Sequence, residues 1–190
     1  MNLNNSFSFI FLGDTHGFLN DFEKQREILE KYRPEFVLAE CLEDFYLESE
    51  KDYQEILQKK FISNMTSFSR IKDLIELCCR RKIKLVGIDF RNFGFNEELQ
   101  KKIKNQQKIS AEEEKEIDKI ISDRENRHLK FLEEYKNKST KPIIVILGSW
   151  HLRKKSPIFE ELDNYKLIFP CDEKGNLVFE PKDNISWCEK

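Results

Sequence analysis

The 190-residue chain lacks an apolar stretch long enough to span a bilayer, and its first residues lack the charged region and the cleavage pattern of a signal peptide. It also lacks a large charge excess of either sign, since its formal net charge is −2. A basic surface for nucleic acid is therefore not expected, and the basic run at 153–155 is too short to indicate one. We accordingly expect neither a membrane nor a nucleic acid as partner. The sequence leaves the oligomeric state open.

The five cysteines include no C-x-x-C pair, and two of them are neighbours that cannot easily serve one tetrahedral site. An odd number without paired spacing argues against a disulfide scaffold and against a structural zinc site. This usage is typical of a reducing compartment, so we expect a cytoplasmic location. The length suits one domain over 1–190, and a hydrophobic fraction of 39% is enough for a packed core.

Histidine is scarce as well, because the chain has three, and two of them lie in copies of one short pattern. The pattern G-x-x-H occurs as G-D-T-H at 13–16, after an apolar run at 7–12, and as G-S-W-H at 148–151, after a run at 143–147. An apolar run closed by glycine is typical of a buried strand that turns sharply. In open α/β sheets, ligands bind beyond the carboxyl ends of such strands. Both histidines are therefore expected at a binding edge.

Two more apolar runs, at 36–39 and 84–88, stop at a carboxylate. The four strand ends carry, in chain order, His16, Glu40, Asp89 and His151, with Asp14 close to the first. Any one of these polar residues could simply mark the end of a strand without belonging to a functional site, because every strand must end. Two histidines and two carboxylates at one rim of a parallel sheet instead favour a site, since they combine metal-binding and proton-transfer capacity.

The order of the remaining elements predicts a single α/β domain with a mixed, largely parallel sheet, helices on both faces and a helical insertion. The first two strands flank one crossover helix, so they are expected to pair in parallel. The segment of about 42–82 contains no credible strand and forms the expected helical insertion. The charged segment of about 96–138 predicts two helices, the second long, acting either as a solvated surface helix carrying His128 or as a lid. The tail at 166–179 alternates like a hairpin.

The same residues allow two interpretations of the chemistry at this site. His16, Glu40 and His151 match the two-histidine, one-carboxylate ligand set of hydrolytic zinc sites, so a divalent metal such as zinc, manganese or cobalt is one interpretation. Without a metal, His16 takes a proton from water while Glu40 or Asp14 holds its tautomer. His151 then stabilises developing charge or protonates the leaving group. A nucleophilic serine has less support, because the second motif lacks the G-x-S-x-G turn.

The D-T-H at 14–16 resembles the first motif of calcineurin-like metallophosphoesterases, but the later motifs of that family are not matched. The chain more closely resembles the superfamily that links TraB/PrgY proteins, Tiki proteases, ChaN-type haem-uptake proteins and erythromycin esterases. Their pattern runs from a first G-x-x-H through a P-x-x-V-x-x-E strand, a G-x-D strand end and an acidic-Arg-acidic helix to a second G-x-x-H. It is matched in this order at 13–16, 34–40, 87–89, 123–125 and 148–151.

The resemblance implies a division of labour among the site residues. The core active-site residues would be His16, Glu40 and His151, with Asp89, Arg124 and Glu125 as supporting groups. The leading function is hydrolysis of an ester or amide bond in a small molecule or peptide, with water activated by a metal or directly by histidine. The alternative is a haem- or small-ligand-binding protein of the ChaN type, and a metallophosphoesterase is a lesser one.

Overall fold

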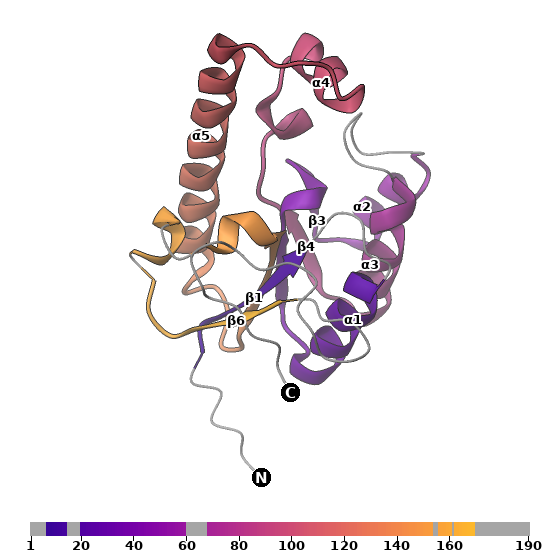
Figure 1. Cartoon of the computed structure of the whole chain (residues 1–190). Helices are drawn as coiled ribbons and strands as arrows, with labels where there is room; N and C mark the ends of the chain where they lie inside the picture. The colour runs from indigo at the N-terminus through magenta and orange to yellow at the C-terminus, as the bar shows by residue number, and fades with distance from the viewer. Residues whose placement is uncertain (1–6, 15–19, 60–67, 154–155, 161, 170–190) are drawn as a thin grey trace.

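A computed structural model describes residues 7–14, 20–59, 68–153, 156–160 and 162–169. Its centre is a six-stranded sheet in the order β3-β4-β2-β5-β1-β6 (Figure 1). The strands are β1 (Phe9–Asp14), β2 (Phe36–Ala39), β3 (Tyr46–Leu47), β4 (Lys84–Gly87), β5 (Ile143–Gly148) and β6 (Tyr165–Ile168). All neighbouring strands are parallel except β3, which pairs antiparallel with β4. The expected α/β class with a mixed, largely parallel sheet is confirmed.

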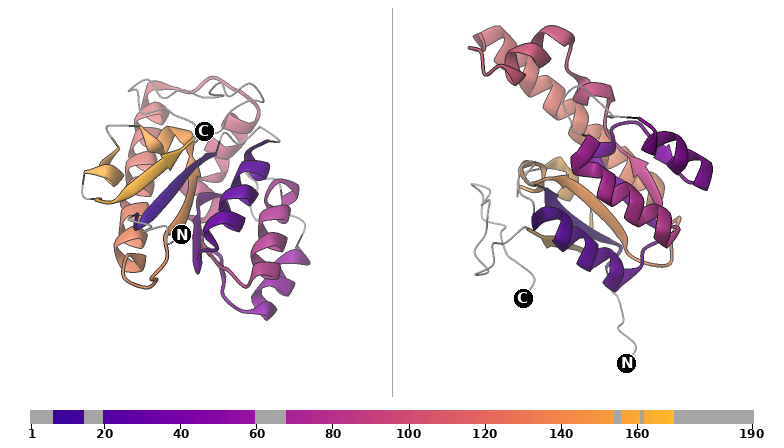
Figure 2. Two further views of the ribbon diagram at one scale, coloured as in Figure 1. Left: turned by 90° about the horizontal axis from the view of Figure 1, so that it is seen from below. Right: turned by 90° about the vertical axis from the view of Figure 1, so that its right-hand side faces the viewer.

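Helices cover both faces of this sheet (Figures 1 and 2). The α-helices are α1 (Asn20–Tyr32), α2 (Glu50–Leu57), α3 (Phe68–Arg81), α4 (Glu97–Lys104) and α5 (Ala111–Tyr135). Short 3-10 turns are η1 (Glu40–Leu42), η2 (Arg91–Gly94), η3 (Ser149–Leu152) and η4 (Pro157–Phe159). Helices α1, α2 and α3 lie on one side, and α5 with η4 lies on the other. None of the helices in the described ranges is both long and apolar enough to cross a membrane.

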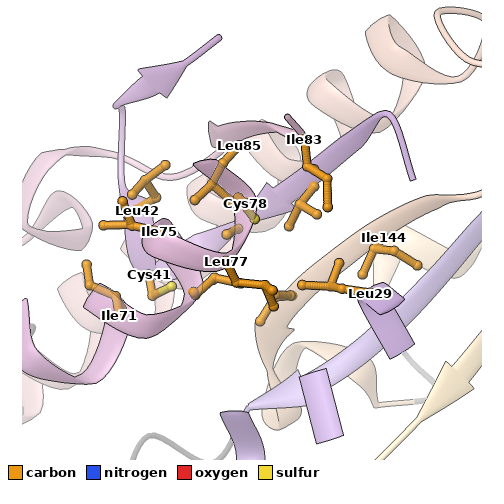
Figure 3. Close-up of a cluster of buried hydrophobic side chains, with 14 of the residues drawn as sticks. Leu29, Cys41, Leu42, Ile71, Ile75, Leu77, Cys78, Ile83, Leu85 and Ile144 are labelled. Carbon is orange, nitrogen blue, oxygen red and sulfur yellow. The ribbon is translucent and has the colours of Figure 1, made fainter. Parts of the chain in front are cut away.

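Alternate side chains of the strands build two separate cores. Ile144 of β5 belongs to the same buried cluster as Leu29 and Ile75, on the α1–α3 face (Figure 3). Val145, its neighbour, packs with Leu132 on the α5 face. Because both faces are covered, the strands are continuous apolar runs rather than alternating ones. Burying one such aliphatic side chain contributes about 1.5–3 kcal/mol to the stability of the fold. The sheet is therefore a stable support for the residues at its edge.

The expected direct pairing of the first two strands is wrong, because β5 lies between them. Gly148 is in register with Asp14 of β1, and on its other side β5 pairs with β2. A crossover helix fixes parallel direction but not adjacency, so the strongly apolar run at 143–147 takes the centre of the sheet. The chain leaves β1 toward the α1 face and leaves β5 toward the α5 face. The two motif strands therefore form a topological switch point, where open α/β sheets bind ligands.

The helical insertion contains α2 and α3, but also a strand that the sequence did not predict. Strand β3 has only two residues, too few for a periodicity to show, and it pairs with β4 next to Gly87. A Cβ on Gly87 would lie 2.3 Å from the carbonyl oxygen of Glu43. Only glycine allows this close approach of the two backbones.

The charged segment forms two helices as predicted, and α5 begins at a capping box. The Ser110 hydroxyl accepts the Glu113 N–H at 3.3 Å, and the Glu113 carboxylate accepts the Ser110 N–H at 2.9 Å. The first half of α5 is largely exposed and projects with α4 beyond the sheet (Figure 2). Its second half buries Phe131 and Tyr135 on the sheet. In the expected tail hairpin, the first strand corresponds to β6, which pairs with β1, and the remainder lies outside the described residues.

Candidate functional site

Glu40 is the first residue after β2, and its buried carboxylate joins three elements. Its Oε2 accepts the backbone N–H of Gly148 at 2.5 Å, which ties the end of β2 to the end of β5. Its Oε1 accepts a hydrogen bond from the guanidinium of Arg124 on α5. The 3-10 turn η1 begins at Glu40, and the Gly148 hydrogen bond places its carboxylate at the end of β5, on the edge of the sheet that carries the switch point.

Arg124 bridges two buried carboxylates. Its Nε lies 2.9 Å from Oδ2 of Asp89 and its Nη2 lies 2.7 Å from the same oxygen, while Nη2 also contacts Glu40. The aromatic ring of Phe93 lies under the guanidinium, 5.0 Å from its carbon to the ring centre. Asp89, which is fully buried, also accepts the Phe90 N–H at 2.7 Å. The planar guanidinium of arginine donates several hydrogen bonds in fixed directions and can bind two carboxylates in this geometry, whereas the compact ammonium of lysine cannot.

His151 in η3 lies between two carboxylates and is only 4% exposed. Its Nδ1 is 3.1 Å from Oε1 of Glu125, and its Nε2 is 3.6 Å from Oε1 of Glu40. Arg153 binds Glu125 from the other side, with Nη2 donating to Oε2 at 3.0 Å. Nδ1 is thus within hydrogen-bond distance of Glu125, whereas Nε2 forms an ion pair with Glu40 that is longer than a hydrogen bond.

The charges around His151 determine its protonation. Burial alone would lower its pKa, but the negative charge of Glu40 and the hydrogen bond to Glu125 outweigh burial and raise the pKa to about 9. Burial would raise the pKa of Glu40, but the charges of His151 and Arg124 hold it well below its usual range. Burial likewise opposes ionisation of Asp89, but its contacts with His128 and Arg124 lower its pKa. Burial also opposes ionisation of Glu125, but its contacts with His151 and Arg153 lower its pKa. At neutral pH, His151 is an imidazolium held by carboxylates.

This raised pKa predicts a pH-dependent stability. A histidine whose pKa rises on folding stabilises the protein fully below its unfolded value of 6.5, and this stabilisation is lost as the pH rises through about 9. We expect the free energy of unfolding to fall by about 3 kcal/mol over this interval. Urea denaturation at several pH values measures it, with His151→Gln as the control that should remove most of the slope. A wild-type profile parallel to that of the variant would contradict the prediction.

The described residues do not fit the expected metal site. Both Glu40 oxygens are already occupied, one by a backbone N–H and the other by a cation, Arg124. Across the described ranges, no group of three or more His, Cys, Asp or Glu side chains is arranged to hold an ion. The third expected ligand, His16, lies outside these ranges, so a metal stays a prediction and no step below depends on one.

The structure brings most of the expected site residues together. These are Glu40, Asp89, Arg124, Glu125 and His151. Asp14 ends β1 in register with Gly148, at the same edge of the sheet. The convergence of Glu40, Asp89 and His151 was inferred from parallel strand ends, that of Arg124 and Glu125 was implied by the resemblance, and all catalytic roles remain predictions.

The prediction from the sequence that His128 lies on the surface is wrong, because this histidine is fully buried. Its Nε2 lies 3.3 Å from Oδ2 of Asp89, and its ring meets the His151 ring edge-on with centres 5.3 Å apart. The error arose because α5 is so highly charged that its buried end did not stand out. The available signal was spacing, since His128 lies four residues after Arg124 and three after Glu125, on the same helix face.

The fold and the site define a class: an open α/β domain with a buried network of ion pairs at the switch point between β1 and β5. No family model, curated protein or solved structure matches the chain. The similarity inferred from the motifs therefore remains a prediction, and functional inference depends on the geometry of the site.

Proposed function

We propose that the protein is a hydrolase of ester or amide bonds in a small molecule or peptide. The observation that supports this most is the position of His151, buried at the switch point with Nδ1 3.1 Å from Glu125 and Nε2 3.6 Å from Glu40. Such a group is a general acid with a fixed orientation. It lies at the switch point, where a ligand is expected.

In the proposed reaction, water attacks the carbonyl carbon while His16 takes its proton. The Nε2–H of His151 is transferred to the oxygen or nitrogen of the leaving group as the carbonyl carbon releases it. Glu40 and Glu125 stabilise the imidazolium before the reaction. Arg124 positions Glu40 and is itself held in place by its second partner, the carboxylate of Asp89. Solvent then returns the proton from His16 to His151. General acid–base catalysis of this kind contributes about 10²–10⁴-fold to a rate.

We also propose a cytoplasmic location. Cys41, Cys78 and Cys79 are free thiols, and Cys41 and Cys78 are buried in the core of the α1–α3 face. Burial raises the pKa of the Cys41 thiol well above its ordinary value, so this thiol is unreactive. Free thiols of this kind suit a reducing compartment.

The test is a panel of activated esters and fluorogenic amides, assayed with and without a chelator. We expect turnover that persists in chelator, with one ¹⁸O from labelled water in the acid product, because a histidine rather than a metal activates the water. Turnover that is lost in chelator and restored by zinc, manganese or cobalt would support the metal interpretation instead. No turnover, together with stoichiometric haem binding and a Soret band that His151→Gln removes, would replace the hydrolase with a haem-binding protein.

A further inference from the structure

Trp150 is a large apolar side chain that stays exposed next to the most buried charges of the molecule. It precedes His151 in η3, and its indole is 46% exposed. The two rings meet edge-on with centres 5.6 Å apart. An exposed tryptophan adjoining a candidate acid is placed to contact whatever His151 acts on.

The indole is supported from behind by Arg153. The guanidinium carbon of Arg153 lies 3.7 Å from the centre of the Trp150 ring, and Nη1 also contacts the Trp150 carbonyl oxygen at 3.3 Å. The same guanidinium donates to both oxygens of Glu125. Its rotamer is therefore fixed from two sides, and the indole has a rigid backing.

The charge of this pair determines what it can bind. Because both Glu125 oxygens engage Arg153, the cation is compensated and little of its charge is left for an anion. What faces solvent is a flat, uncharged and electron-rich ring. Such a surface prefers another flat ring, by stacking or by an edge-on contact.

We propose that Trp150 backed by Arg153 is a substrate-binding platform for an uncharged aromatic group in the leaving alcohol or amine. This rests on the proposed hydrolase, in which His151 protonates the leaving group. The side of the substrate nearest His151 is then the side nearest the indole. The platform assigns a substrate class: benzyl-type esters and amides.

Kinetics test the platform with two acetate esters that differ only in the ring, benzyl and cyclohexylmethyl. We expect kcat/KM to favour the benzyl ester by about 3- to 10-fold, the range of an aromatic pair. Trp150→Leu should abolish this preference and Trp150→Phe should retain it. Tyr46→Leu is the control, because Tyr46 is similarly exposed at 47% but lies on edge strand β3. Equal kcat/KM for both esters in the wild type and in Trp150→Leu would overturn the platform and leave the hydrolase intact.

Binding without turnover separates the two proposals. The chain has two tryptophans, so Trp187→Phe leaves Trp150 as the only indole fluorophore. N-benzylmethanesulfonamide, which lacks a scissile carbonyl, should change this fluorescence saturably, and its cyclohexylmethyl counterpart should bind about 3- to 10-fold more weakly. Saturable, ring-selective binding with no ester hydrolysed would support the platform and reject the hydrolase. No saturable binding of either sulfonamide would overturn the platform whatever the turnover.

Discussion

Arg124→Met is expected to lower the free energy of unfolding by about 3–5 kcal/mol, because it removes the guanidinium that binds two buried carboxylates. Arg124 is 7% exposed, Glu40 is 3% exposed and Asp89 is fully buried, so water cannot replace the lost contacts. Urea denaturation measures the loss as a lower midpoint at an unchanged slope. The expected loss is a large share of the stability of an ordinary domain.

Arg81→Met is the matched control, since Arg81 pairs with Glu30 at 2.9 Å on the surface. That exposed pair should contribute less than about 1 kcal/mol. Arg124→Lys should fall between wild type and Arg124→Met, because lysine keeps the charge and loses the fork. Equal losses for Arg124→Met and Arg81→Met would show that the buried network does not stabilise the fold.

His151→Gln is expected to lower kcat/KM by about 10²–10⁴-fold, because glutamine fills a similar space but cannot donate an acidic proton. The measurement is kcat/KM on the best ester of the panel. A histidine at an exposed rim of the sheet would contribute little packing, so its replacement would leave stability nearly unchanged. The structure corrects this, since His151 is buried and its loss removes one of the two charged partners of Glu40 and of Glu125, leaving Arg124 and Arg153.

A control must therefore separate lost activity from lost stability. Ile75→Val removes one methyl group from the core of the α1–α3 face and should cost about 0.5–1.5 kcal/mol while keeping kcat/KM. An active His151→Gln protein would overturn the assignment of His151 as the acid. So would a loss that appears equally in Ile75→Val at the same fraction folded.

The parts of the fold that the sequence predicts are those set by local physics. Continuous apolar runs define β1, β2, β4 and β5, and parallel strand ends place Glu40, Asp89 and His151 at one edge. Helix periodicity and the Ser110 capping box define α5. These signals are contained in a few neighbouring residues.

The parts that the sequence did not predict depend on contacts between distant segments. No local feature of the sequence indicates that β5 lies between β1 and β2, because each of the apolar runs has the composition of a central strand. The burial of His128 depends on which end of α5 packs on the sheet. The two-residue strand β3 exists because β4 offers an open edge, and the backbone at Gly87 approaches Glu43 closely only in the folded chain.

The position of β5 also constrains the order in which the protein forms during synthesis. Both sheet neighbours of β1, namely β5 and β6, come from residues 143–168, so β1 has no partner until most of the chain has left the ribosome. The unit β2-β4-β3 can pair earlier, because its strands are contributed by residues 36–87. Pairings of such long sequence separation slow folding and leave apolar strands exposed in the meantime. Strand β1, which contains two phenylalanines, is thus an apolar segment that stays without its sheet partners while most of the chain is synthesised.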